Sequence, residues 1–255
     1  MVITGEMVEE VQETLEKVTE ALERNGLKVN REKTEHLEGR WRGAVNSEGR
    51  VRIQGTELNK VAQYKYLGSM VQEDGEIERE MTSRIQAGWA KFRMASGVLC
   101  DRKIPMKLKG KFYSTAVRPA MMYGSECWAV KKTQEHKMQV AEMRMLRMMC
   151  GVTRRDRIEN EYVRENLGVE SIRDRLAQGR LRWYGHMMRR QADDVVKKVW
   201  KEEQGGKRGR GRPELTWDAV IRRDMKERGL EDSMVWDRHE WRLAIRIPTP
   251  GKLGK

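Results

Sequence analysis

The chain has 255 residues, with 52 Lys and Arg against 39 Asp and Glu, so its formal net charge is +13 and its pI is near 9.7. No apolar run approaches the roughly 18 residues of a membrane span, and the N-terminus has no signal-peptide pattern. We therefore expect an intracellular protein, nuclear or cytoplasmic, that is not secreted and has no membrane partner.

The first predicted elements are a helix and two extended pieces. Apolar residues recur at steps of three and four between Val8 and Leu22, which predicts an amphipathic helix over residues 6–25. Asn25-Gly26 then supplies a left-handed stop. Residues 51–55 (VRIQG) and 62–71 (AQYKYLGSMV) predict strands. This order indicates the edge of an α+β layer.

From Glu76 to Gly151 the pattern is helical. Apolar residues recur three or four apart between Ile77 and Phe92. Pro105 is expected to open the next helix, and Pro119 to end it. A methionine-rich helix follows, which Thr133 is predicted to cap. Its methionines are expected to fill a core.

The last third predicts two more helices around a basic linker. The pair Ser171 and Asp174 has the spacing of a capping box for a helix over residues 172–190. Gly and Arg dominate residues 204–213, a linker composition. Thr216 is predicted to cap an amphipathic helix, and a short tail with two tryptophans follows. Together these elements predict a mainly α fold of the α+β class.

Familiar catalytic motifs are missing. The chain has no GxxxxGK[ST], GxSxG or HExxH, and no aspartate pair in a strand setting that could hold two Mg²⁺ ions. The adjacent Asp193 and Asp194 are expected to be solvated. The three cysteines form no C-x2-C pair, which excludes a disulfide framework and a zinc knuckle, so we expect reduced, buried thiols.

The basic balance favours a polyanionic partner, nucleic acid before acidic membrane. Residues 1–40 sum to −4, residues 41–150 to +9 and residues 151–255 to +8. The first segment therefore presents a different surface from the rest.

Residues 171–190 combine arginines with aromatics. Candidate phosphate-binding residues there are Arg173, Arg180 and Arg182, beside Trp183 and Tyr184, which could stack on bases. The alternative is an apolar stripe that packs in a core while the arginines stay in solvent. One helix can do both, and the sequence leaves the two interpretations open.

The segment RGRGRP resembles the core of an AT-hook, which inserts arginines into a narrow A·T minor groove. Its basic residues are Lys207, Arg208, Arg210 and Arg212. Glu214 follows directly and would repel phosphate. A flexible basic connector with loose phosphate contacts is therefore the favoured interpretation, and groove insertion is the alternative.

Four stretches in order resemble the later part of reverse transcriptases from non-LTR (LINE-type, RTE-like) retrotransposons. They are GLKVNREKTEHL (26–37), AQYKYLGSMV (62–71), RPAMMYGSECW (118–128) and GRLRWYGHMMRR (179–190). The resemblance runs from Met1 to about Trp217. Each stretch alone is a weak signal, and the order and spacing of all four make a strong one.

The resemblance implies a role for each part of the chain. Residues 1–72 would be a partial palm with motif D and the primer-grip hairpin, residues 73–151 a helical thumb, and residues 152–203 a basic helical region. Residues 204–214 would be the basic linker and residues 215–255 a helical tail. Lys33 would lie nearest an incoming nucleotide, and Tyr66, Leu67 and Gly68 would hold the primer 3′ end.

The family's metal-binding aspartate pair would precede Met1. We therefore expect a truncated RNA-directed DNA polymerase fragment that is inactive alone and binds no cofactor, although the full-length family enzyme uses Mg²⁺. Its partners would be an RNA template, a DNA primer or target DNA. The alternatives are a non-enzymatic DNA-binding protein that uses the AT-hook-like segment, and a degenerate reading frame without a selected role.

Overall fold

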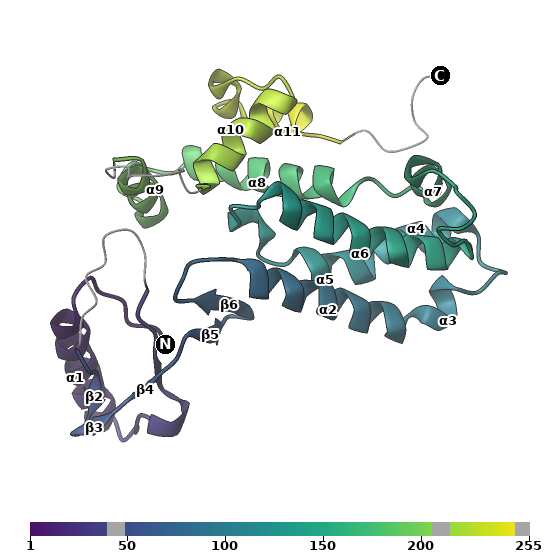
Figure 1. Ribbon diagram of the computed structural model, residues 1–255. Coiled ribbons are helices and arrows are strands. Elements are labelled where there is room, and N and C mark those ends of the chain that lie inside the picture. The colour runs from purple at the N-terminus through teal and green to yellow at the C-terminus, as the bar shows by residue number, and fades with distance from the viewer. Residues whose placement is uncertain (40–48, 206–214, 248–255) are drawn as a thin grey trace. The chain divides into compact units, whose positions relative to one another are not determined.

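The computed structural model describes residues 1–39, 49–205 and 215–247 (Figure 1). The chain divides into two compact units, residues 1–77 and 78–255. The first unit holds 11 Lys and Arg against 15 Asp and Glu, and the second holds 41 against 24. The overall charge of +13 is therefore −4 on the first unit and +17 on the second.

The first unit contains one helix and short strands. The helix α1 spans Val8–Arg24, close to the predicted 6–25. The strands are β1 Glu35–His36, β2 Arg52–Ile53, β3 Thr56–Glu57, β4 Asn59–Lys60, β5 Gln63–Tyr66 and β6 Ser69–Gln72. They form three separate two-stranded ladders: β1–β4 is parallel, whereas β2–β3 and β5–β6 are antiparallel. The expected layer edge is thus a set of small ladders.

The core of this unit lies between α1 and β2. Leu15 of α1 is buried with Val51, Ile53 and Leu58. The Gln12 amide fixes the helix to the strand, because its Nε2 donates to the Arg52 carbonyl at 3.0 Å and its Oε1 accepts from the Arg52 amide at 2.8 Å. This two-way bond holds β2 at one place along α1.

Residues 62–71 fold back on themselves as a hairpin. Leu67 and Gly68 form its two-residue turn, with φ of 48° and 87°, and Tyr66 pairs with Ser69 across it. Two successive positive φ values are typical of the turn that matches strand twist, and glycine suits the second position. Leu67 adopts this left-handed conformation although its side chain favours φ below zero.

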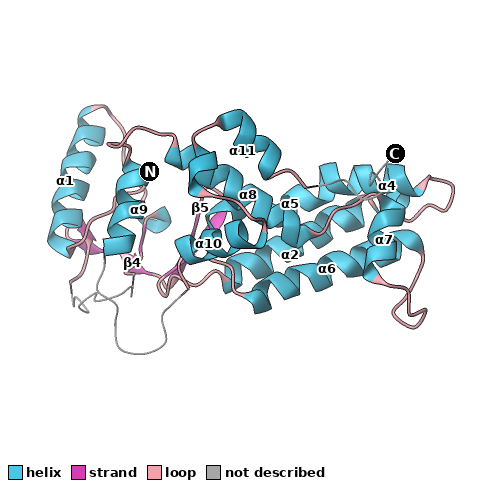
Figure 2. Ribbon diagram, turned by 90° about the horizontal axis from the view of Figure 1, so that it is seen from above, coloured by secondary structure: helices cyan, strands magenta, loops and turns pink. Residues whose placement is uncertain are grey.

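The second unit is helical, which confirms the mainly α class (Figures 1 and 2). The long helix α6 packs against both α2 and α8, and the short helix α5 packs against α2. The bounds are α2 Glu78–Met94, α3 Ser96–Leu99, α4 Met106–Phe112, α5 Arg118–Met122, α6 Lys132–Cys150, α7 Asn160–Leu167, α8 Ile172–Met188, α9 Val195–Gly205, α10 Trp217–Glu227 and α11 Arg238–Ala244. Within the described residues, no helix is both long and apolar enough to cross a bilayer.

Two predicted helix boundaries differ from the structure. Pro119 was expected to end a helix, but it stands in the first turn of α5, after the wide π turn Tyr113–Val117. A proline fits there because first-turn amides need no helical partner. Thr133 lies inside α6; the N-cap is Lys131, whose amide donates to the Gln134 Oε1 atom at 2.9 Å. The Thr216 cap is confirmed, since its hydroxyl accepts from the Ala219 amide at 3.2 Å.

Glu142 of α6 replaces the predicted cap of α8. The Ser171 side chain makes no capping bond; instead, the Ile172 amide donates to Glu142 Oε2 at 3.0 Å. The other oxygen of Glu142 accepts from Arg118 Nη2 at 2.8 Å, and both side chains are almost fully buried. A carboxylate is favoured at a helix N-terminus, where the helix dipole is positive. One buried acid therefore joins α5, α6 and the start of α8.

Aromatic rings close the end of the helical unit around Tyr184. The rings of Trp200, Trp217 and Trp241 lie 6.3–6.4 Å from the Tyr184 ring. Trp241 Nε1 also donates to the Leu181 carbonyl at 3.0 Å. The tryptophans of α9, α10 and α11 thus fasten the C-terminal helices onto α8.

The cysteines do not follow the predicted burial. Cys100 and Cys127 are exposed and Cys150 is half-buried. Cys100 directly follows α3, and Cys127 ends the short 3₁₀ turn before α6. Both stand at element ends, where the chain runs along the surface. The prediction of buried thiols is therefore wrong for these two residues.

Alanine substitution at two helical glycines should act in opposite directions. A Cβ at Gly110 would lie 1.9 Å from the Leu167 carbonyl oxygen, whereas nothing lies within 4 Å of a Cβ at Gly179. We expect Gly110→Ala to lower the unfolding free energy by about 1–3 kcal/mol through overpacking. Gly179→Ala should raise it by about 1 kcal/mol through helix propensity. Urea denaturation measures both changes in unfolding free energy. If both variants were stabilised, the result would contradict the close α4–α7 contact at Gly110.

The stability of the first unit should depend on pH through the protonation of the His36 imidazole. Burial, and then the nearby Lys60 ammonium, hold the pKa of the His36 imidazole below its ordinary value of 6.5. The unfolded chain then binds more protons than the folded chain, so this contribution to stability is present above pH 6.5 and is lost as pH falls. An NMR titration assigned with His36→Asn should give a midpoint below 6.5; a higher midpoint would contradict the burial of this ring.

Candidate nucleic-acid interface

The arginine-rich helix α8 has two different faces. Its buried side carries Ile172, Leu176, Leu181 and Tyr184, all fully buried. This confirms an apolar stripe, in which Tyr184 is fully buried, whereas its neighbour Trp183 is only half-buried. The arginines of α8 are distributed over both faces, so their availability to a ligand must be judged one by one.

Arg180 points into the protein. Its side chain has no exposed surface; Nε donates to Asp224 Oδ2 at 2.7 Å, and Nη2 lies 3.3 Å from Glu135 Oε1. Asp224 belongs to α10 and Glu135 to α6. Two buried carboxylates thus hold the Arg180 guanidinium, so in this structure it is not exposed to a phosphate. The residue joins three helices instead.

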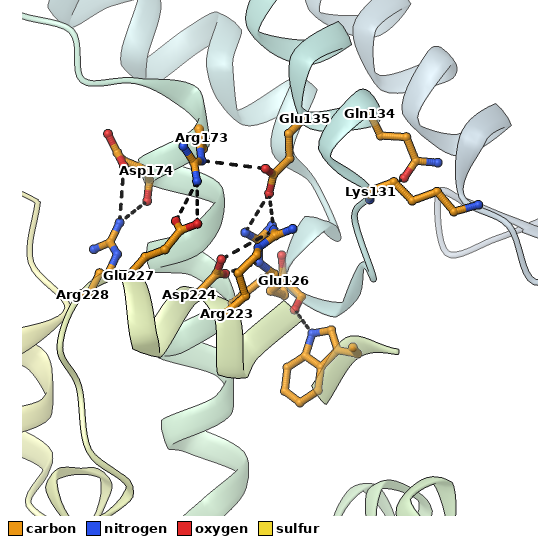
Figure 3. Close-up of polar contacts among 12 residues, drawn as sticks. Glu126, Lys131, Gln134, Glu135, Arg173, Asp174, Arg223, Asp224, Glu227 and Arg228 are labelled. Carbon is orange, nitrogen blue, oxygen red and sulfur yellow. Dashed lines mark hydrogen bonds and ion pairs between the residues drawn. The ribbon is translucent and has the colours of Figure 1, made fainter. Parts of the chain in front are cut away.

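Glu135 is the centre of this ionic cluster (Figure 3). Besides Arg180 it accepts from Arg223 Nη2 at 2.8 Å, and Arg173 Nε lies 3.8 Å away. Arg173 also donates to Glu227 at 2.7 Å. Arg173 is thus exposed but already paired with two acids, and a phosphate would have to compete with them.

The outward face of α8 keeps the remaining basic and aromatic groups. Arg182 is exposed and makes no ion pair with the residues that the structure describes. Trp183 packs on His186 with ring centroids 5.7 Å apart, and the Arg190 guanidinium lies 5.7 Å from the Trp183 ring. Asp194 pairs with Arg190 at 2.9 Å and offsets part of its charge. Among the described residues this face therefore presents Arg182, without an ion pair, beside the tilted Trp183–His186 pair.

The other predicted residues lie in the first unit or outside the described part. Lys33 is exposed at the end of the 3₁₀ turn Arg31–Lys33, and its amide donates to Asn30 Oδ1 at 3.2 Å. Tyr66 and Leu67 are exposed at the hairpin end, where Gly68 completes the turn. The basic residues of the RGRGRP stretch lie outside the described residues: Lys207, Arg208, Arg210 and Arg212.

Sequence reasoning passed over a second group of basic residues, between α6 and α7. Arg154, Arg155 and Arg157 are all exposed, and none forms an ion pair with a described residue. The signal was present as three arginines in four positions of the stretch TRRDR. These arginines were not predicted as a site, because no aromatic residue lies among them and the stretch is outside the four family-like stretches.

The described residues do not fit the Mg²⁺ ions that the resemblance implies. They bring no group of three His, Cys, Asp or Glu side chains together in a way that could hold a metal ion. The adjacent acids near the end of α8 are not poised for one either, because the Asp194 carboxylate already accepts from Arg190 and from the Val196 amide at 3.0 Å.

Comparisons with known proteins point to mobile DNA. A protein of Caenorhabditis elegans described as transposon-derived is 28% identical over 255 residues, which cover 94% of this chain and 88% of that protein. No protein-family model matches the chain, and no solved structure matches it. The chain is thus similar over nearly its whole length to a transposon-derived protein.

The two faces of α8 should respond differently to the loss of an arginine. Arg180→Met removes the guanidinium that is hydrogen-bonded to the buried Asp224 and leaves this acid with the longer 3.7 Å contact to Arg223, so we expect the unfolding free energy to fall by about 3–5 kcal/mol. Arg182→Met removes an exposed charge two positions away and should change it by less than about 0.5 kcal/mol. Urea denaturation of both variants checks this. Equal losses would contradict the assignment of the inward and outward faces.

Proposed function

We propose that this chain binds nucleic acid through its helical unit and through the hairpin β5–β6 of its first unit, as the motif D, primer-grip and thumb region of a non-LTR retrotransposon reverse transcriptase. The similarity to a transposon-derived protein supports the setting. The order of the four family-like stretches supports the narrower assignment. The proposal gives the chain a binding role and no nucleotide-transfer step.

The main support for this proposal is the difference in net charge between the two units. The helical unit holds an excess of 17 positive charges even though its buried acids already pair with arginines. The buried Arg118–Glu142 and Arg180–Asp224 pairs are neutral and contribute nothing to that excess. A polyanion with evenly spaced phosphates gains affinity on a positively charged surface by releasing its counterions. Arginine is well suited to this contact because its planar fork binds phosphate through two donors.

The hairpin β5–β6 is the proposed contact for a primer 3′ end. Leu67 stands at its turn with 76% of its surface exposed, and Tyr66 beside it is 40% exposed. An exposed leucine in a left-handed conformation costs conformational energy that a purely structural turn could avoid with glycine or asparagine. Such strain is found at functional turns more often than elsewhere. Both residues offer apolar surface to a sugar or base.

The test is the binding of short fluorescent probes to the full chain, measured by anisotropy. We expect the affinity for single-stranded and duplex DNA to fall at least about tenfold between about 50 and about 200 mM salt, because phosphate contacts release counterions. A duplex with a recessed 3′ end should bind more tightly than a blunt one. Leu67→Asp should remove that preference, whereas Leu27→Asp, at another exposed leucine of the same unit, should keep it.

Two outcomes decide against the proposal. The absence of binding to every probe, or affinity that does not change with salt, would overturn it. A preference for A·T-rich duplex that disappears in the double variant Arg210→Ala and Arg212→Ala would favour the alternative, an AT-hook-like DNA-binding protein.

A further inference from the structure

The loop between α6 and α7 is held in shape by its own hydrogen bonds. Gly151 ends α6 in the left-handed conformation with φ of 67°. Arg147, in the last turn of α6, then donates to the carbonyls of Thr153 at 3.2 Å and Ile158 at 2.6 Å, and to the Asn160 side chain at 2.9 Å. A single guanidinium thus fixes both ends of the loop.

A second set of bonds shapes the loop from within. Asp156 Oδ2 accepts from the Thr153 amide at 2.6 Å and from the Thr153 hydroxyl at 2.9 Å. Both bonds lower the pKa of the Asp156 carboxyl, and the bond from the Thr153 backbone amide has the larger effect. The same hydroxyl accepts from the Arg155 amide at 3.2 Å. The one acid between the arginines is therefore engaged by the Thr153 donors and forms no ion pair with its neighbours.

Three arginine side chains project from this frame. Arg154, Arg155 and Arg157 are exposed, and no described residue forms an ion pair with any of them. Elsewhere in the unit, arginines are commonly paired, as Arg118 with Glu142 and Arg180 with Asp224. Three like charges within four residues repel one another, and the single negative charge of Asp156 offsets only part of that repulsion. A bound polyanion would remove it.

We propose that the loop 153–157 is a phosphate clamp for a nucleic-acid strand, with Arg154, Arg155 and Arg157 on the backbone and Arg147 and Asp156 as positioning residues. The inference rests on the proposed nucleic-acid binding and assigns it a place. Because the loop is held in shape before the ligand arrives, little ordering entropy is lost on binding. The loop carries no aromatic side chain, so the contact reads phosphates and not bases.

The experiment uses the full chain and fluorescein-labelled oligothymidylate, with anisotropy measured across the salt range. The test variant changes Arg154, Arg155 and Arg157 to glutamine. The matched control also introduces glutamine, at Arg238, Arg242 and Arg246. These three exposed arginines of the C-terminal helix region form no ion pair with a described residue. Both variants lose three charges, so a purely electrostatic attraction would weaken equally in the two.

We expect the loop variant to bind at least about tenfold more weakly at moderate salt and the slope of log affinity against log salt to fall by about two. The control should change the affinity by less than about threefold. Equal losses would overturn the clamp while leaving the proposed function standing. If the unaltered chain does not bind the probe, the proposed function itself fails.

A second variant separates shape from charge. Asp156→Ala removes a negative charge, so electrostatics alone predicts tighter binding. The clamp predicts weaker binding, because the loop loses the bonds to Thr153; tighter binding would overturn it. The thermal midpoint of this variant should match that of the unaltered chain. A competition with poly-glutamate at equal charge concentration tests the other kind of ligand. If poly-glutamate displaces the strand from the unaltered chain but not from the triple variant, the loop binds an acidic protein, and the clamp is overturned.

Discussion

Two buried carboxylates of α6, Glu135 and Glu142, hold the helical unit together. They stand two helical turns apart, so they share one face of α6. Glu142 takes the Arg118 guanidinium of α5 and the first amide of α8, while Glu135 takes Arg180 of α8 and Arg223 of α10. Apolar packing alone could slide along the helices, but charged hydrogen bonds in a dry interior fix one register, because an unpaired buried charge is costly.

This arrangement divides the arginines into two classes. The inward class neutralises buried acids and sets the position of α8, and the outward class stays available to a ligand. A chain with an excess of positive charge would otherwise repel itself when it folds. Pairing some of the arginines inside relieves part of that repulsion and concentrates the rest at defined places. The outward face of α8 and the loop after α6 are two such places, and both lie on the unit that carries +17.

Local patterns predicted the helices well, because each depends on residues within a few positions. The spacing from Val8 to Leu22 was sufficient for α1, and Thr216 was sufficient for the start of α10. The roles of Arg180 and Arg182 could not be separated in this way, since their difference lies in Asp224 and Glu135, which are 44 and 45 positions from Arg180. The predicted Ser171 cap is wrong for the same reason, because Glu142, 30 positions before Ile172, accepts the Ile172 amide in its place. Long-range ionic partners leave no periodic signal in a sequence.

The most direct measurement of this division is arginine footprinting with phenylglyoxal, read by mass spectrometry with and without single-stranded DNA. The account predicts that Arg154, Arg155, Arg157 and Arg182 react rapidly in the free protein and become protected when the strand is bound. Arg118 and Arg180 should stay unreactive in both states, because their guanidiniums are buried against acids. Reaction of Arg118 and Arg180 at the rate of Arg182, or a strand that protects none of the four exposed arginines, would contradict it.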